Sequence, residues 1–281
     1  MSASPLPRGK AEEEQHQMKR VFFGATVVAA AAMVAACSGG GSGAGARDAS
    51  AKLIRTAAAL EKKLGAPGEK AQMPSADDPD VRAFDGEANR ALTELGTPAM
   101  PVAGSDSFDR LCGPATNITA AYVSAGLGGA NANGLPVEDQ AKAAKMNENA
   151  TRYMAQMMTP LLYLGHCTAV HMPIIDKEFE GRDLSGKAAA VAQVRNGAYG
   201  QFTGLVQLAA SGDIQPEQRK RVMDVLVRDT GSFATAFSRA QRQELGATID
   251  QAAQASPEFK AQAGRIRADI ANAPCRKLCS A

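Results

Sequence analysis

The fold class is decided by residues 187–211, which read KAAAVAQVRNGAYGQFTGLVQLAAS. The apolar residues recur every three or four positions and so share one helical face: Val191, Val194, Ala198, Phe202 and Leu205. Glycines at 197, 200 and 204 fall on a neighbouring face, where they would allow a close helix crossing. A membrane span is untenable because Gln193, Arg195 and Gln201 interrupt the stretch. The pattern therefore predicts a helix packed against other helices.

The same spacing recurs along most of the chain. Helices are expected over 53–64, 79–95, 114–125, 136–172, 187–211, from 216 onward, over 232–255 and from 256 onward. In the longest of these, Thr159-Pro160 is expected to kink or restart the helix and Met172-Pro173 to end it, because proline lacks an N–H. Alanine is abundant, β-branched runs are rare, and no segment reads as a strand. The expected fold is all-α, a bundle-like domain of about seven to nine helices.

The N-terminal segment has the pattern of an export signal. Met18-Lys19-Arg20 is positively charged, and the run VFFGATVVAAAAMVAA follows it. A helix needs roughly 20 apolar residues to span a bilayer, so the shorter run suits the apolar core of a signal peptide better. Three acidic residues at 12–14 precede the positive segment, which is unusual for a signal and favours Met18 as the true start. The alternatives are a short membrane anchor and a plain secretory signal.

The end of that run reads Val34-Ala35-Ala36-Cys37. It resembles the lipobox of bacterial lipoproteins, in which an aliphatic and two small residues precede a cysteine. The resemblance implies that a signal peptide, 1–36, is removed and that Cys37 carries a lipid that attaches the protein to the membrane. Residues 37–50, with SGGGSGAGA at 38–46, are then expected to be a flexible tether, and 51–281 a helical periplasmic domain.

The resemblance also implies a location in the bacterial cell envelope. Ser38 is not the aspartate that, as a family rule, retains lipoproteins in the inner membrane. The expectation is the outer membrane facing the periplasm in a Gram-negative host, and otherwise the outer face of the plasma membrane.

Charge and composition weigh against two classes of ligand. Of the 31 basic and 29 acidic residues, four basic and three acidic ones lie in 1–36, which leaves 27 and 26 in the mature chain. This balance gives no electrostatic case for nucleic acid, which calls for a clearly basic face. The chain has no tryptophan and four tyrosines. This composition disfavours a glycan-binding cleft, because such clefts usually stack sugars on aromatic rings.

Four cysteines remain after Cys37: Cys112, Cys167, Cys275 and Cys279. An even number in an exported protein indicates two disulfides rather than free buried thiols, and four cysteines allow three pairings. Shorter loops close more readily, which favours Cys112 with Cys167 and Cys275 with Cys279. The first pair then needs the break at Thr159-Pro160, and the second needs an irregular turn. The rival pairings would instead attach the C-terminal tail to the helical body.

Methionine, histidine and cysteine gather in 153–172, which reads YMAQMMTPLLYLGHCTAVHM. Thioether, thiol and imidazole groups are ligands for Cu(I), so His166, Cys167 and His171 are weak candidates for a soft-metal site. Cys167 and His171 share a helical face, whereas His166 and His171 do not. The competing interpretation, core packing with Cys167 oxidised, is favoured because methionine commonly fills gaps in cores.

Signatures of enzymes are not found in the sequence. It contains no Gly-x-Ser-x-Gly, no His-Glu-x-x-His and no P-loop, and the carboxylates Asp176, Glu178 and Glu180 are expected to form a solvated turn. We therefore expect a membrane-anchored helical domain that binds or scaffolds, with a protein partner in the cell envelope and no cofactor. The alternatives are a periplasmic copper-binding protein and an uncharacterised periplasmic enzyme.

Overall fold

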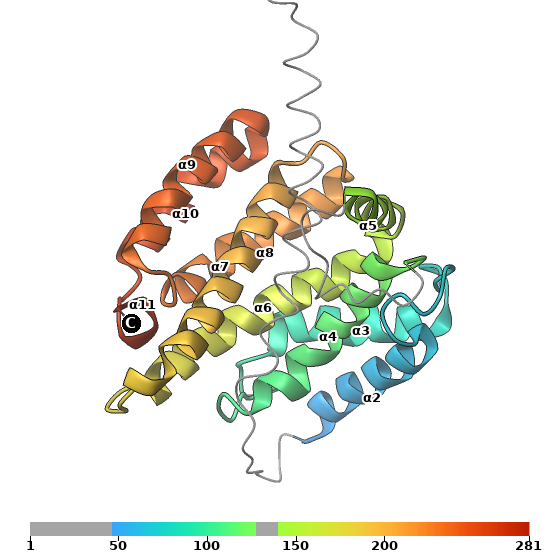
Figure 1. Cartoon of the computed structure of the whole chain (residues 1–281), viewed down its shortest axis with the longest axis horizontal. Coiled ribbons are helices and arrows are strands. Elements are labelled where there is room, and N and C mark those ends of the chain that lie inside the picture. Colours follow the sequence, from blue (N-terminus) through green and yellow to red (C-terminus); the bar gives the residue numbers. More distant parts are fainter. Residues whose placement is uncertain (1–46, 128–139, 281) are drawn as a thin grey trace, which may run out of the picture.

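The computed structural model of the chain describes residues 47–127 and 140–280 (Figure 1). The expected signal peptide at 1–36, Cys37 with its expected lipid, the tether to residue 46 and residues 128–139, part of a Gly/Asn-rich stretch expected to link two helices, lie outside the described residues. Across the described ranges the secondary structure is helical, with no β-strand and a single isolated bridge between Leu95 and Met100. The all-α expectation is confirmed.

Ten α-helices and one 3₁₀-helix make up the described part of the chain. They are α2 (Arg47–Leu64), α3 (Pro79–Glu94), α4 (Ser107–Ser124), α5 (Gln140–Arg152), α6 (Met154–Glu178), η3 (Ser185–Lys187), α7 (Ala188–Ala210), α8 (Pro216–Ala234), α9 (Arg239–Ala255), α10 (Pro257–Asn272) and α11 (Lys277–Ser280). None of these helices is both long and apolar enough to cross a membrane.

Several helices begin where a side chain satisfies a free backbone N–H. Asp78 accepts a hydrogen bond from the N–H of Asp80 ahead of α3, and Ser256 accepts one from Phe259 ahead of α10. Each cap is followed by a proline, whose missing N–H costs nothing in the first turn. Ser238 and Gln241 form a reciprocal capping box at the start of α9. Local sequence therefore sets these three boundaries.

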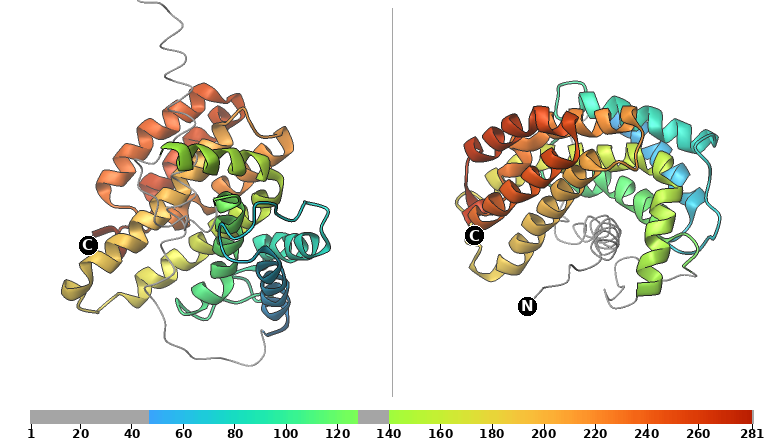
Figure 2. Two further views of the ribbon diagram at one scale, coloured as in Figure 1. Left: turned by 45° about the vertical axis from the view of Figure 1, so that its right-hand side comes forward. Right: turned by 90° about the horizontal axis from the view of Figure 1, so that it is seen from above.

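Helix α6 lies at the centre of the molecule, between two hydrophobic cores (Figure 1). Met158, Leu162 and Ala169 belong to the core shared with α7 to α10, whereas Tyr163 and Leu164 belong to the core shared with α2 to α5. A helix that is apolar on both sides is buried on both sides. Seen from above, the surrounding helices form an arch that has α5 at one end and α7 at the other (Figure 2).

The helix does not restart at Thr159-Pro160. The long helix is interrupted instead at Tyr153, and α6 then runs through Pro160 and Pro173 to Glu178, so residues 173–178 are helical rather than a loop. A proline inside a helix costs about 3 kcal/mol. Burial of large side chains on either side of each proline offsets that cost, among them Met158, Leu162, Met172 and Ile175.

Other predicted boundaries also need correction. Helix α4 begins at Ser107, so Pro114 lies inside it rather than at its start. The residues expected to open the helix over 232–255 divide between the end of α8 and a turn before α9. Helix α2 begins at Arg47, so the last four residues of the predicted tether are helical. Tertiary burial extends α4 beyond its local signals, because Phe108, Leu111 and Cys112 are all buried.

Helix α6 approaches its neighbours closely at Gly165. A Cβ atom added there would lie 2.9 Å from Leu205 Cδ1 of α7 and 3.9 Å from Val225 Cγ1 of α8. The sequence predicted a close crossing at the glycines of α7. The crossing of α6 and α7 described here depends instead on Gly165 of α6. The absence of a side chain at Gly165 lets the central helix pack against both α7 and α8.

Candidate functional site

The structure joins the cysteines in the pairing that the sequence favoured. Cys112 of α4 and Cys167 of α6 form one disulfide, with Cα atoms 5.8 Å apart, and Cys275 and Cys279 form the other, at 5.1 Å. The break thought necessary for the first pair is not needed, because α4 begins seven residues earlier than expected and lies beside α6. Cys275 precedes α11, so the second pair does span an irregular turn.

Two of the candidate metal ligands, Cys167 and His171, come together with Cys112 around the first disulfide. The Sγ atoms of Cys112 and Cys167 and a ring nitrogen of His171 all lie within 4.8 Å of one another, and all three residues are buried. The Nδ1 atom of His171 lies 3.9 Å from Cys112 Sγ and 2.8 Å from the carbonyl oxygen of Cys167. Sequence reasoning paired Cys112 with Cys167 but did not name Cys112 as a metal-ligand candidate beside His171, because that contact depends on how α4 packs against α6.

Ser107, the first residue of α4, completes the surroundings of His171. Its Oγ lies 2.8 Å from His171 Nε2 and 2.6 Å from the carbonyl oxygen of Gly104. Burial lowers the pKa of His171 to about 4, so the imidazole is neutral at pH 7. A serine hydroxyl beside a neutral imidazole is the arrangement of a nucleophile and its base. Both side chains are buried here, so neither meets a substrate in this conformation.

His166 does not belong to this cluster, which corrects the three-residue set His166, Cys167 and His171. It lies on the other side of α6, where its Nδ1 is 3.0 Å from an oxygen of Asp229 on α8. Arg228 donates two hydrogen bonds of 2.8 Å to the same carboxylate. Although burial opposes ionisation of Asp229, hydrogen bonds from Arg228 and His166 lower its pKa below the usual value. The hydrogen bond between His166 and Asp229 is a buried link between α6 and α8.

A groove of about 600 Å³ lies between α8 and α10. Its apolar lining includes Met223 and Val227, one helical turn apart on α8. Around them stand four basic side chains, Arg219, Lys220, Arg228 and Arg265, and two acidic ones, Asp224 and Glu258. Basic groups therefore exceed acidic groups around an apolar floor. No sequence pattern pointed to this surface, because its two sides come from separate helices.

Three of the four basic groups of the groove are only loosely neutralised, whereas Arg228 makes two hydrogen bonds of 2.8 Å to Asp229. Arg219 lies 3.8 Å from Glu258, and the Nε atom of Arg219 is buried without a hydrogen-bond partner in the described part of the chain. Arg265 lies 3.9 Å from Asp269. Lys220 and Asp224 form a closer pair of 2.7 Å, but both side chains are more than half exposed. Exposed pairs of this kind contribute about 0–1 kcal/mol, so an anionic partner would find these cations available.

The C-terminal tail is attached to the helical body by hydrogen bonds and ion pairs. The N–H of Leu278 donates to Asp176 at 2.8 Å, and Arg276 pairs with Glu180 at the same distance. Glu178 accepts a hydrogen bond of 3.0 Å from the backbone N–H of Ser105. The three carboxylates expected to form a solvated turn therefore hold other segments in place. Asp176 is buried, and that burial raises its pKa.

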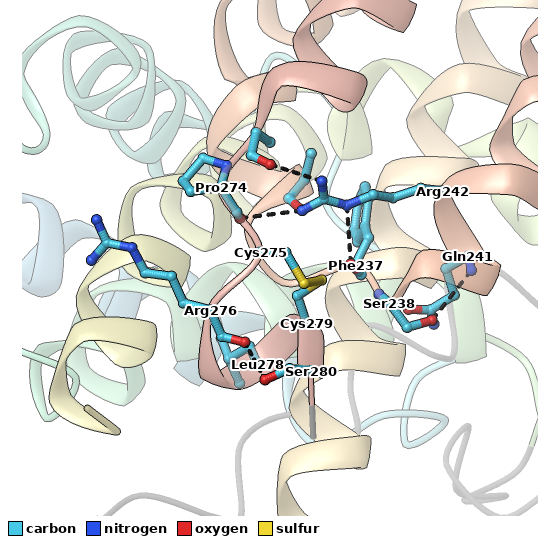
Figure 3. Close-up of a disulfide and its surroundings, with 12 residues drawn as sticks. Phe237, Ser238, Gln241, Arg242, Pro274, Cys275, Arg276, Leu278, Cys279 and Ser280 are labelled. Atoms are coloured by element: carbon cyan, nitrogen blue, oxygen red, sulfur yellow. Dashed lines mark hydrogen bonds between the residues drawn. A yellow bond between two sulfur atoms is a disulfide. The ribbon is translucent and has the colours of Figure 1, made fainter. Parts of the chain in front are cut away.

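Arg242 of α9 hydrogen-bonds to the C-terminal ends of two helices beside the second disulfide (Figure 3). Its guanidinium donates to five backbone carbonyls, at distances of 2.7 to 3.3 Å: those of Ala234, Phe237, Ile270, Ala273 and Pro274. The last carbonyls of a helix have no partner within the helix. One side chain therefore satisfies the C-terminal ends of α8 and α10 together and positions the segment that carries the Cys275–Cys279 disulfide.

Comparison with known proteins adds no family to this description. No protein-family model, no curated protein and no solved structure matches the chain.

Proposed function

We propose that the protein is a lipid-anchored binding module of the bacterial cell envelope, and that the α8–α10 groove holds an acidic, amphipathic segment of a protein partner. The observation that carries this proposal is the groove itself, with its apolar floor and its excess of basic side chains. The lipobox-like residues Val34 to Cys37 and the Gly/Ser-rich segment after them support the anchor, and Ser38 favours the periplasmic face of the outer membrane in a Gram-negative host.

An amphipathic helix is the partner whose chemistry fits this surface. Such a helix docks by its apolar face, with a few side chains as anchors, and a groove of this volume has room for a few side chains. Met223 and Val227 would contact those anchors. Carboxylates flanking the apolar face would meet Arg265, Lys220 and Arg219, and charge pairs at the edge of an interface mainly increase the association rate and the specificity.

The test uses the mature lipoprotein in detergent and a synthetic helical peptide that has a leucine stripe flanked by glutamates. We expect the peptide to bind, with an affinity that falls as salt rises, and a matched peptide with lysines in place of the glutamates to bind at least tenfold more weakly. Fluorescence anisotropy measures both affinities.

Two variants on α10 locate the contact. Arg265→Glu reverses a charge in the groove and is expected to weaken binding of the acidic peptide about tenfold, which corresponds to about 1.4 kcal/mol. Lys260→Glu makes the same charge change on an exposed residue of α10 that does not line the groove, and it is expected to leave the affinity within twofold. Equal binding to both variants, or no binding of the acidic peptide to the parent protein, would overturn the groove as the binding site.

A further inference from the structure

We propose that Cys112, Cys167 and His171 form a Cu(I) site when the Cys112–Cys167 disulfide is reduced. This inference is independent of the groove and of its partner. It rests on the proximity of two sulfur atoms and one imidazole nitrogen, all within 4.8 Å of one another and all shielded from water. Thiolate and imidazole are ligands that suit Cu(I), which accepts low coordination numbers and soft donors.

One sulfur–nitrogen distance already fits a metal between the side chains. With metal–sulfur and metal–nitrogen bonds of about 2.3 and 2.0 Å, a trigonal site separates sulfur from nitrogen by about 3.7 Å. The Nδ1 atom of His171 lies 3.9 Å from Cys112 Sγ. The two cysteine sulfurs must move apart once their bond is broken, and rotation about the Cα–Cβ bonds achieves this while the Cα atoms stay 5.8 Å apart. The hydroxyl of Tyr163, 3.8 Å from Cys167 Sγ, adds a polar neighbour for a thiolate.

The ring N–H of His171 has a hydrogen-bond acceptor both in the disulfide form and in the proposed metal-bound form. In the disulfide form, Nδ1–H donates to the carbonyl of Cys167, and Nε2 then accepts the single hydroxyl proton of Ser107, which is not donated to Gly104 in that state. To bind a metal, Nδ1 must expose its lone pair, so the proton must be on Nε2. Ser107 Oγ can then accept from Nε2–H while donating its own proton to the carbonyl of Gly104, 2.6 Å away. Metal-bound histidines usually donate their other ring N–H to such an acceptor, so Ser107 is a positioning residue for the site.

The chemical steps balance with a dithiol as the reductant. Two electrons and two protons pass from the dithiol to the Cys112–Cys167 bond, which becomes two thiols, while the reductant is oxidised to its own disulfide. Cu(I) binding then releases the two thiol protons to water and forms two copper–sulfur bonds and one copper–nitrogen bond. The disulfide form has no thiolate to offer, so the redox state of this pair switches copper binding on and off.

The test is an anaerobic titration in which the protein competes with a coloured Cu(I) chelator, bicinchoninate. The second disulfide is removed first, with a Cys275→Ser/Cys279→Ser variant, so that only one cysteine pair remains after Cys37. We expect the protein, reduced and then freed of reductant, to withdraw one equivalent of Cu(I) and to gain an ultraviolet thiolate-to-copper band. The oxidised protein should withdraw none.

Substitutions in the same background identify the ligands. Cys112→Ser and His171→Gln should each lower the Cu(I) affinity by at least a hundredfold, and Ser107→Ala should lower it 10- to 100-fold, the usual effect of losing the partner of a metal-bound histidine. His166→Gln, which changes the histidine on the other side of α6, should leave it unchanged. Binding that persists without Cys112 or His171, or that requires His166, would overturn the assignment, as would a site that takes Zn(II) in preference to Cu(I).

Reduction removes a link between two helices, so circular dichroism accompanies the titration. A reduced chain that keeps its helical signal and takes up copper supports the proposal. A chain that loses helical signal on reduction and regains it only with Cu(I), in a manner that depends on His171, supports it equally. A reduced chain that takes up no copper, whether folded or unfolded, refutes it.

Discussion

At the scale of single residues, Arg242 connects the ends of two helices, a role that no pattern in the sequence indicates. Its five carbonyl partners belong to the end of α8, the turn after it and the end of α10. Arginine suits this place because its planar group carries five donors, whereas lysine carries three on a single nitrogen. A charged donor shared between helix ends therefore takes the place of several separate caps.

Replacing Arg242 by alanine should lower the free energy of unfolding by about 2–4 kcal/mol, because several buried carbonyls lose their only charged donor. Arg242→Lys should recover less than half of the loss. Urea unfolding followed by circular dichroism measures both. The matched control is Arg239→Ala, an exposed arginine three residues earlier on α9, with an expected change below about 0.5 kcal/mol. A loss at Arg242 no larger than at Arg239 would show that the carbonyl cluster is not stabilising.

Asp85 is a second residue whose environment only the fold defines. It lies on α3 near Arg221 of α8 and Thr159 of α6, and one of its carboxylate oxygens has no hydrogen-bond partner in the described residues. Burial raises the pKa of Asp85 to about 6, against the opposing effects of Arg221 and Thr159. Since the folded pKa exceeds the ordinary value of 3.8, the protonated form is favoured in the folded state.

This shift predicts a pH dependence with a definite sign. The contribution of Asp85 to stability is fully present below about pH 4 and is lost as the pH rises through about 6. Asp85→Asn, which mimics the protonated form, should therefore be more stable than the parent by about 1–3 kcal/mol at pH 8 and equal to it at pH 4. Urea midpoints at the two pH values test this, with the exposed Asp224→Asn as control. A difference that does not change with pH would contradict the assignment.

At the scale of elements, the two disulfides differ in what they connect. Cys112–Cys167 joins α4 to α6 across a sequence separation of 55, whereas Cys275–Cys279 closes a turn at the C-terminus with a sequence separation of 4. In the chain-entropy account, a longer closed loop restricts the unfolded chain more. The first bridge also holds two elements of one core together, and the second shapes a tail that Asp176 and Glu180 already hold against α6.

Removing each pair by double serine substitution should separate these roles. Cys112→Ser/Cys167→Ser should cost about 4 kcal/mol in the free energy of unfolding, and Cys275→Ser/Cys279→Ser about 2 kcal/mol, in line with their loop lengths. Thermal and urea unfolding under non-reducing conditions provide the comparison. If the C-terminal pair proves the more important of the two, the tail rather than the α4–α6 contact would be the principal staple.

At the scale of the whole molecule, the proposed anchor lies outside the described residues and is tested by localisation. Cys37→Ser removes the thiol that would carry the lipid. We expect the variant to remain unprocessed or to move to the soluble fraction, because stable anchoring requires at least two membrane-binding signals and the lipid would supply them. Membrane fractionation and the mass of the mature chain measure the outcome. Processing and membrane attachment identical to the parent would rule out the lipoprotein proposal without affecting the groove.

Most of the helices could be predicted from the sequence, because their signals are local. The apolar stripe of residues 187–211 matches α7, and the caps at Asp78, Ser238 and Ser256 require only neighbouring backbone groups. The disulfide pairing was also the one favoured by loop length, since short loops close more readily. Within the candidate site, the spacing of His166 and His171 correctly placed them on different faces of one helix.

Tertiary structure alone decided the remaining features, because they depend on contacts between different helices. Pro160 and Pro173 remain helical because burial on both sides of α6 outweighs a local penalty. Cys112 and Ser107 reach His171, and Asp176 receives the tail, through contacts between residues at least 55 positions apart in the chain. Local propensity and periodicity indicate which secondary structure a short segment of the chain prefers. Which buried polar groups meet, and which helix is enclosed by two cores, depends on burial and hydrogen bonding summed over the packed molecule.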